Sequence, residues 1–325
     1  GVGVPITLLQ GGAGLWQGNL GLGADITNYG AVNCNATVNF SYHSILNYGE
    51  FDVAGPHTFN AIYSPASFEN HGLLKKPAID AGTFSIGILI VNHPDGDISV
   101  ENGELYASIH CQNYGHTDVS LSGIFHTHTL EIYNTTTFTG NGEVKITGNG
   151  LYANNTSPVT FDNAETSLNA NGFTGSGSLI FPHHLTGLSG SIQTPMTITS
   201  TGSMNIDGPG VGISNNNCVN NGQLIIHSNL TFSNGKLTNY GTISLTGPYT
   251  IGIYAASAGI FNHGTVIKPA AFPDVFTFGI PLHNEAGSHF FIQNGILHLT
   301  SDLYNAAEVV VSAGALLRVF NTHIY

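Results

Sequence analysis

The feature that most constrains the fold is a short phrase that the chain contains twice. Residues 69–78 read ENHGLLKKPA, and residues 261–270 read FNHGTVIKPA. At a constant offset of 192 residues the two copies align without a gap from Asn70 to Ser108 of the first copy, and 13 of the 39 aligned positions are identical. A catalytic motif is needed once, whereas a structural unit that is stacked many times recurs together with its flanks. The sequence therefore predicts a repeat architecture.

Short units of a turn followed by a strand fill the chain. The commonest pattern is Asn, one residue or none, Gly, and then alternating apolar and polar residues, as in NYGTISLTG from Asn239 and NGEVKITG from Asn141. Asn and Gly tolerate the left-handed backbone conformation and mark sharp turns, while alternation at period two indicates half-buried strands. No window carries the sustained apolar stripe of a helix. These patterns predict an all-β protein.

A stack of coils explains both the repeat and the turn spacing. A sandwich or a barrel has no need for the same phrase to return in register after 192 residues, but a solenoid does. We therefore predict a single parallel β-helix (β-solenoid) domain over residues 1–325, with about 13 to 16 coils and little or no helix. Residues 1–9 are expected to form a free or exchanged N-terminal strand.

The composition limits the partners. Six Lys and Arg against 19 Asp and Glu give a formal net charge of −13. Nucleic acids and anionic membranes need clustered cations, so neither is an expected partner. The sequence also lacks a run of about 20 apolar residues and a basic leader, which predicts no transmembrane segment and a mature or trimmed chain. Cys34, Cys111 and Cys218 lie far apart without a CxxC pair, so at most one internal disulfide can form and the odd thiol is either free or paired with a neighbouring subunit. We favour buried free cysteines.

Two segments resemble a known group of proteins. Residues 238–269, TNYGTISLTGPYTIGIYAASAGIFNHGTVIKP, resemble the Asn-x-Gly-Thr-Ile repeats in the passenger regions of bacterial autotransporters and related surface β-helix adhesins, and residues 290–302, FFIQNGILHLTSD, resemble the ending of such repeats. The resemblance implies a right-handed parallel β-helix on or outside a bacterial cell. The sequence contains no translocator barrel, so the secretion route stays open. In an exported protein, the Asn-x-Ser/Thr sequons are possible glycosylation sites: Asn35, Asn39, Asn134, Asn154, Asn155 and Asn229.

Parallel β-helices include polysaccharide lyases and glycoside hydrolases, so an enzyme is one alternative. Glycoside hydrolysis needs two carboxyl groups at a fixed separation, and Asp95 and Asp97 share a strand face. The segment His-Pro-Asp-Gly is also strong turn chemistry, and we favour that interpretation. A lyase that acts on acidic sugars needs cations, but Arg318 is the only arginine. We therefore predict no catalytic residue.

Histidines and aromatic residues are the other candidates. His126 and His128 share a strand face, but a zinc site needs further ligands, so we predict no metal site and no cofactor. His71 and His263 replace the Tyr found at the same turn position elsewhere, which indicates a flat ring packing over the turn. Solvent-facing Tyr and Phe are able to stack on sugars, and this leaves a monomeric adhesin or glycan-binding module, with surface glycans as partners, as a second alternative.

Both ends of the sequence look like strands without a cap. Apolar residues that alternate along the first strand, and two on one face of the last, are the predicted subunit interface: Val2, Val4, Ile6, Leu8, Leu316 and Phe320. Uncapped, weakly charged strand edges favour association with copies of the same chain. We therefore expect an extracellular or cell-surface structural protein that self-assembles into a fibre or layer.

Overall fold

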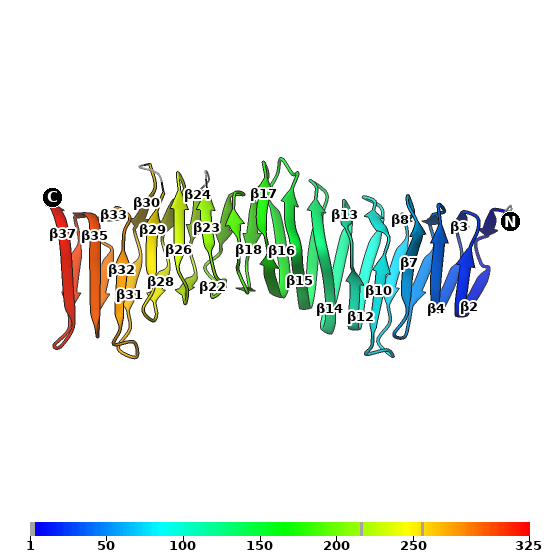
Figure 1. Ribbon diagram of the computed structural model, residues 1–325, viewed down its shortest axis with the longest axis horizontal. Helices are drawn as coiled ribbons and strands as arrows, with labels where there is room; N and C mark the ends of the chain where they lie inside the picture. Colours follow the sequence, from blue (N-terminus) through cyan, green and yellow to red (C-terminus); the bar gives the residue numbers. More distant parts are fainter. Residues whose placement is uncertain (1–3, 215–216, 255–256) are drawn as a thin grey trace. The chain divides into compact units, whose positions relative to one another are not determined.

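The computed structural model describes residues 4–214, 217–254 and 257–325. These residues are all β, without helix, and make about 15 turns of a parallel stacked-coil solenoid (Figure 1). The predicted all-β parallel β-helix is therefore confirmed. The chain divides into two compact units, unit 1 (Gly1–Thr166) and unit 2 (Ser167–Tyr325), and the expectation of one domain over residues 1–325 stays a prediction.

Most strands of unit 1 are short, with three to six residues between sharp turns. Its strands are β1 (Ile6–Leu8), β2 (Ala13–Leu22), β3 (Ile26–Asn28), β4 (Ala31–Ser41), β5 (Ile45–Asn47), β6 (Glu50–Val53), β7 (Thr58–Tyr63), β8 (Ser67–Asn70), β9 (Leu73–Lys76), β10 (Thr83–Gly87), β11 (Leu89–Asn92), β12 (Asp97–Ala107), β13 (Cys111–Asn113), β14 (His116–Ile132), β15 (Thr137–Ala153) and β16 (Val159–Ala170), the last of which contains the boundary to unit 2.

Unit 2 is built in the same way. Its strands are β17 (Gly172–Gly175), β18 (Leu179–Phe181), β19 (His184–Thr186), β20 (Ser191–Ile192), β21 (Met196–Ile198), β22 (Ser203–Ile206), β23 (Val211–Ser214), β24 (Asn217–Asn220), β25 (Gln223–Ile226), β26 (Leu230–Ser233), β27 (Lys236–Asn239), β28 (Thr242–Leu245), β29 (Thr250–Ile253), β30 (Gly259–Asn262), β31 (Thr265–Lys268), β32 (Val275–Phe278), β33 (Leu282–Asn284), β34 (His289–Ile292), β35 (Ile296–Asn305), β36 (Glu308–Val311) and β37 (Leu316–Ile324).

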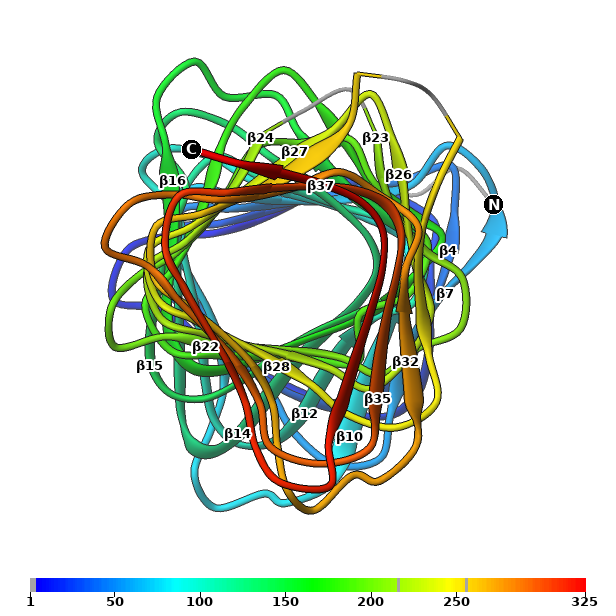
Figure 2. The ribbon, with the colours of Figure 1, turned by 90° about the vertical axis from the view of Figure 1, so that its left-hand side faces the viewer.

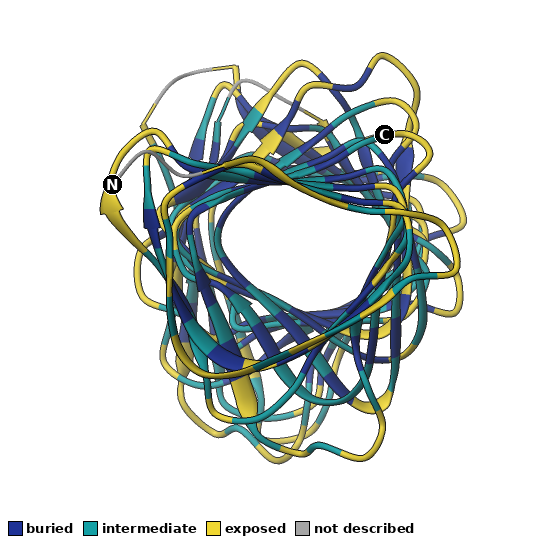
Figure 3. Ribbon diagram, turned by 90° about the vertical axis from the view of Figure 1, so that its right-hand side faces the viewer, coloured by how far each residue is buried: buried dark blue, intermediate teal, exposed yellow. Residues whose placement is uncertain are grey.

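The core lies inside the coils, because side chains alternate between the inner and the outer face of each strand. In β4 the inward residues are buried and the outward residues are exposed or half-buried. Figure 2 shows that successive coils of a unit superpose, and Figure 3 shows that buried and less buried positions alternate along the strands. In unit 1 the rings of Phe51 and Phe68 pack edge to face at 5.1 Å, and those of Phe59 and Phe84 at 5.0 Å. Large apolar side chains thus fill the interior.

One buried column of each unit is polar, and we call it the asparagine ladder. In unit 1 the side-chain amides of the first four members each donate to the Oδ1 of the asparagine one coil further on, at 2.7 to 2.8 Å, and the amide of the last, Asn113, donates to Thr117 Oγ1. The members are Asn28, Asn47, Asn70, Asn92 and Asn113. All five are fully buried. Because every amide is hydrogen-bonded and four of the five bonds join successive coils, the ladder fixes the register of the stack at little desolvation cost.

The ladder of unit 2 repeats that of unit 1. Its members are Asn220, Asn239, Asn262, Asn284 and Asn305. The separations between successive members are 19, 23, 22 and 21 residues in both units. The predicted equivalence of Asn70 and Asn262 is confirmed. The duplication at an offset of 192 residues therefore extends over all coils of both ladders, well beyond the segment in which the residues are recognisably alike.

The glycine of the Asn-x-Gly turns has a different role from the one expected. Gly49 and Gly72 do not have left-handed backbones; instead, a Cβ on either would lie 2.0 or 2.2 Å from a carbonyl oxygen of the preceding coil. These glycines are required because neighbouring coils approach closely. In two Asn-Gly turns the expectation holds, since Gly103 and Gly295 both have φ of 68°. In two others it does not, because a Cβ on Gly142 or Gly222 would lie 2.2 or 2.1 Å from a carbonyl oxygen.

Candidate functional site

The first coil of unit 1 exposes apolar side chains on the side facing away from the next coil. β1 pairs in parallel with β3, with Ile6 opposite Ile26 and Leu8 opposite Asn28. Since Ile26 and Asn28 are buried, Ile6 and Leu8 point toward the interior face of their coil. Ile6 is nevertheless 56% exposed and Val4 is 78% exposed. The first coil therefore exposes apolar side chains whose equivalents in the inner coils of unit 1 are buried.

An apolar groove of about 480 Å³ lies on this first coil. Trp16 and Leu20 line it from β2, where they are in register with the buried Cys34 and Val38 of β4. The indole of Trp16 packs edge to face against Phe51 with ring centroids 5.3 Å apart. A groove lined by apolar side chains and an aromatic ring suits another apolar surface.

The N-terminal segment is not a free strand within the part of the chain that the structure describes. Ile6, Thr7 and Leu8 form three consecutive pairs with β3 of the same chain. The segment pairs with the next coil because Ile6 and Leu8 have the same inward alternation as Ile26 and Asn28 of β3. Val2, which the sequence also placed in the interface, lies outside the described residues.

At the C-terminal coil the two residues of the predicted interface lie on the outer face of the strand. Leu316 and Phe320 lie on the outward face of β37 and are 42% and 75% exposed. The residues that continue the core are Leu317 and Val319, which are in register with Leu297 and Leu299 of β35. Leu316 and Phe320 are therefore on the side of the coil, whereas a stacked partner would cover Leu317 and Val319.

The paired carboxylates of the sequence analysis form a turn. Gly96 donates a backbone hydrogen bond of 2.8 Å to the carbonyl of His93, which closes the turn around Asp95. Asp95 Oδ1 lies 2.9 Å from Nδ1 of His71, and Asp97 begins β12. The turn interpretation is confirmed, and the Asp95 carboxylate takes part in a contact between coils.

His126 lies between a carboxylate and a hydroxyl group, an arrangement that resembles a catalytic site. Its Nδ1 is 2.7 Å from Glu104 Oε1 and its Nε2 is 2.9 Å from Thr147 Oγ1, while Tyr106 stacks on the ring at 4.1 Å. Burial lowers the pKa of His126 more than Glu104 raises it, so the ring is neutral near neutral pH. This order of groups is that of a hydrolase triad. A similar bond joins His227 to a threonine one coil away without a carboxylate, so pairing between coils explains it equally well.

The remaining candidate chemistry is sparse. Among the described residues no group of three or more His, Cys, Asp or Glu is placed to hold a metal ion. Cys34, Cys111 and Cys218 are buried thiols, as predicted, and burial raises the pKa of each to about 12. No helix capable of crossing a membrane occurs in the described ranges.

The sequons differ in accessibility. Asn35, Asn134, Asn154 and Asn229 are exposed, and Asn39 is half-buried beside Asn19. Asn155 is only 1% exposed and its Nδ2 donates to the carbonyl of Ser157. A glycan on Asn155 therefore has no room in the folded unit, whereas the exposed asparagines leave room for one.

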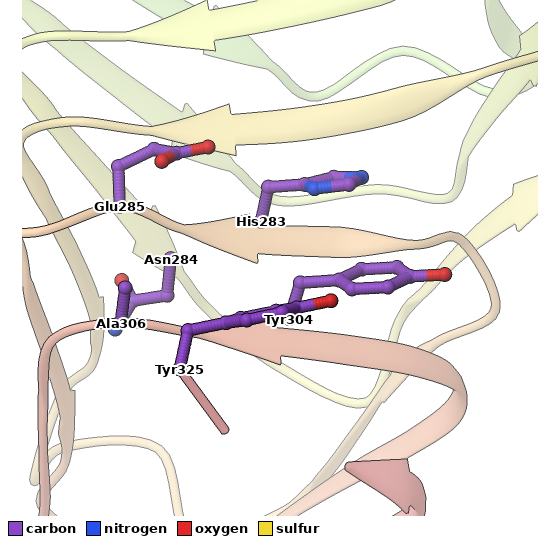
Figure 4. A pocket seen from close by; sticks show the side chains of 6 residues that line it. All are labelled: His283, Asn284, Glu285, Tyr304, Ala306 and Tyr325. Carbon is purple, nitrogen blue, oxygen red and sulfur yellow. The ribbon is translucent and has the colours of Figure 1, made fainter. Parts of the chain in front are cut away.

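Aromatic rings form stacks that run from coil to coil on the outer surface. In unit 1, Tyr48 stacks on Tyr29 at 5.0 Å and on His71 at 4.8 Å. In unit 2, Tyr304 stacks on His283 at 4.5 Å, beside a pocket of about 410 Å³ that Tyr325 also lines (Figure 4). The rings cover the turns, as predicted for His71.

Three interior or edge residues are not recognisable as such from the repeat pattern alone. Trp16 was not singled out, although its alternation with Leu20 is a strand signal. Lys76 and Lys268 are fully buried, and their position in the repeat gave no sign of it.

No protein-family model, no curated protein and no solved structure matches this chain.

Proposed function

We propose that this chain is an extracellular structural protein, a β-helical subunit whose copies stack into a fibre or layer at a cell surface. The observation that carries the proposal is the apolar groove of the first coil, lined by Ile6, Trp16 and Leu20. The location rests on the resemblance to surface β-helix repeats and on a composition with only 8% charged residues. The proposal assigns the chain no catalytic activity, no cofactor and no metal.

The direction of the strands supports stacking of one copy on another. All coils within a unit pair in parallel, so the open edges of β37 in one copy and β2 in the next have the polarity needed to continue a parallel sheet. Backbone pairs across such a junction contribute about 0.5 to 1.5 kcal/mol each, and burial of the apolar side chains provides most of the affinity.

The side chains at the two edges also match column by column. In unit 1, the inward column that begins at Leu20 continues to Ile86. In unit 2, the inward column that contains Phe278 ends at Val319. Ile86 and Phe278 are partners at the offset of 192 residues. A stacked copy therefore sets Val319 against Leu20 within one column.

A second column gives the same result. Leu8 is in register with Asn28, and Ile324 is in register with Asn305, so both apolar residues occupy the column of the asparagine ladder. An apolar pair at this place in the junction leaves no ladder amide unpaired, because Asn305 donates to the carbonyl of Ala307 in its own chain. The junction is thus apolar in both columns.

The test is the size of the purified chain and of charged variants, measured by sedimentation and electron microscopy. We expect the unaltered chain to form elongated assemblies, and Leu20→Lys or Val319→Lys to abolish them, because a buried unpaired charge is costly. Leu121→Lys is the matched control, since Leu121 is 84% exposed on the side of unit 1. A mixture of Leu20→Lys and Val319→Glu copies should restore association. A chain that stays monomeric at every concentration contradicts the proposal.

A further inference from the structure

Unit 1 carries a second groove, separate from the first-coil edge and of different chemistry. This groove has a volume of about 580 Å³ and lies on the outer side of β3, β5 and β8. Thr27, Leu46 and Glu69 lie in one outward row across it, since the three strands are in register. Tyr42 lines one side. Three successive coils contribute, so the groove is about 10 Å long in the direction of stacking.

The side chain of Tyr42 is presented to solvent by an unusual backbone. Its φ is 64°, in the left-handed region that is costly for a bulky residue. The ring is 61% exposed and stacks in parallel with Tyr63, with centroids 5.2 Å apart and an angle of 6° between the planes. The stack holds the Tyr42 ring at the groove, and so limits the entropy lost when a ligand binds.

The duplication provides an internal comparison for this position. At an offset of 192 residues, Tyr42 corresponds to Asn234, which has φ of 57°. The coil therefore requires a left-handed residue at this place in both units. Unit 2 uses asparagine, which tolerates that conformation, whereas unit 1 uses tyrosine in spite of its cost. The backbone conformation of the coil does not explain why unit 1 has tyrosine at position 42. A role for the Tyr42 ring does explain it.

The other polar groups of the groove are also confined to unit 1. The residues compared are Asp25, Ser44, Ser67 and Glu69 in unit 1, and Asn217, Lys236, Gly259 and Phe261 at the same offset in unit 2. Unit 2 therefore keeps the coil lengths but has an amide, an amine and two apolar positions in place of these carboxylates and hydroxyls. Since the ladder and the core are alike in both units, the groove chemistry is not needed to build a coil.

The hydrogen bonds within the groove leave acceptors available. Asp25 Oδ1 accepts the backbone N–H of Ser44 at 2.9 Å and lies 3.4 Å from His43. Glu69 Oε1 accepts from Ser67 at 3.2 Å, and its Oε2 lies 3.5 Å from His93. A carboxylate has about four lone-pair sites, so both groups can accept further hydrogen bonds. The residues lining the groove include two carboxylates and no lysine or arginine, which disfavours an anionic ligand.

We propose that this groove binds a neutral oligosaccharide. The apolar face of a sugar ring packs against the exposed ring of Tyr42 and the Leu46 side chain, while sugar hydroxyl groups donate to Asp25 and Glu69. The hydroxyls of Ser44 and Ser67, which are 2.8 Å apart, offer further acceptors at the middle of the groove, since Ser67 donates to Glu69 and Ser44 to Ser67. This binding is independent of whether copies of the chain stack.

The test uses saturation-transfer NMR and calorimetry with maltotriose, cellotriose, laminaritriose and triacetylchitotriose as probes. We expect at least one trisaccharide to bind the unaltered chain. Tyr42→Asn introduces the residue that unit 2 has and keeps the left-handed turn, so it should fold normally and bind about fivefold to tenfold more weakly. Glu69→Gln should also weaken binding. Tyr240→Ala removes a stacked tyrosine that is 56% exposed in unit 2, and should leave binding unchanged.

Three results overturn the proposal. The first is no saturation transfer to any of the four trisaccharides. The second is binding that Tyr42→Asn leaves unchanged, which places the sugar elsewhere. The third is binding of choline but of no sugar, which makes the groove a cation site formed by an aromatic ring and carboxylates. Far-ultraviolet circular dichroism of each variant confirms that the fold is intact.

Discussion

The side-chain amide of Asn70 donates a 2.7 Å hydrogen bond to Oδ1 of Asn92, one coil further along unit 1. The same amide also donates to the carbonyl of Asp97 at 2.8 Å, and Asn70 Oδ1 accepts from Asn47. One buried side chain therefore connects three consecutive coils. In unit 2, Asn262 has the same connections to Asn239 and Asn284.

Replacing a ladder asparagine should destabilise the unit that contains it. Asn70→Ala leaves buried polar atoms of Asn47 and Asn92 without their partner, and we expect a loss of about 2 to 3 kcal/mol in the free energy of unfolding. Asn70→Asp should be at least as damaging, because it places a carboxylate against Asn92 Oδ1. Urea unfolding followed by circular dichroism measures the effect.

Asn19→Ala is the control for this prediction, since Asn19 makes a similar 2.8 Å amide bond to Asn39 but on the exposed surface. Its effect should stay within about 0.5 kcal/mol. If the buried and exposed substitutions cost the same, the ladder does not stabilise the stack.

The ladder also shows how far the sequence could predict the fold. The Asn-x-Gly pattern and the period-two alternation predicted turns and strands correctly, because both depend on neighbouring residues. The burial of Asn70 could not be predicted in the same way, since its partner Asn92 is 22 residues away and asparagine is usually exposed. Only the stacking of coils brings the two amides together.

The last coil and the groove beside Tyr42 illustrate two further limits. β37 has apolar residues on both faces, and the alternation alone does not show that Leu317, rather than Leu316, faces the interior. Register with β35 decides it. The left-handed backbone of Tyr42 was equally hidden, because tyrosine gives no signal for that conformation. Its partner Asn234 carries the signal, and the alignable segment begins only at Asn70 of the first copy.

The two buried lysines should respond differently to substitution. Lys76 Nζ lies 2.6 Å from Asp80 Oδ2, whereas Lys268 Nζ donates to the carbonyl of Phe272, and burial lowers the pKa of Lys268. Asp80→Asn leaves the Lys76 charge buried without its carboxylate, and should cost about 3 kcal/mol. Lys268→Met removes a buried charge and should be nearly neutral or stabilising.

Thermal or urea unfolding of the two variants checks this difference. Lys76→Met serves as the matched control for Lys268→Met, and should be the more damaging of the two because it removes the ion pair with Asp80. Equal effects of the two methionine substitutions would show that the carboxylate of Asp80 does not matter for stability.

The cysteines should resist thiol reagents in the folded chain. Burial raises the pKa of Cys34, Cys111 and Cys218 to about 12, so roughly one thiol in 10⁴ is ionised at about pH 8. We expect almost no reaction with Ellman's reagent until guanidinium is added, and then all three thiols should react. Rapid labelling of any one cysteine in the native chain contradicts its burial.

Asp52 is the carboxylate whose ionisation should oppose folding of unit 1. Its Oδ1 is buried without a hydrogen-bond partner, and burial together with the charge of Glu50 raises its pKa to about 6 in spite of the nearby Lys75. The ordinary pKa of 3.8 applies when the chain is unfolded. The unfolded chain thus releases this proton at lower pH than the folded chain, so stability is lost as pH rises through about 6.

Asp52→Asn should therefore stabilise the chain above about pH 7 and have little effect near pH 4. We expect a gain of about 1 kcal/mol at the higher pH, less than the shift alone would give, because Asp52 is partly exposed and solvent screens its charge. Urea unfolding of both proteins at the two pH values measures it.

Glu50→Gln should give a smaller gain in the same direction. It removes the neighbouring charge that helps to raise the pKa of Asp52, but it leaves the Asp52 carboxylate buried. A variant that is equally stabilised at both pH values would show that the cause is the shape of the asparagine and not the ionisation of Asp52.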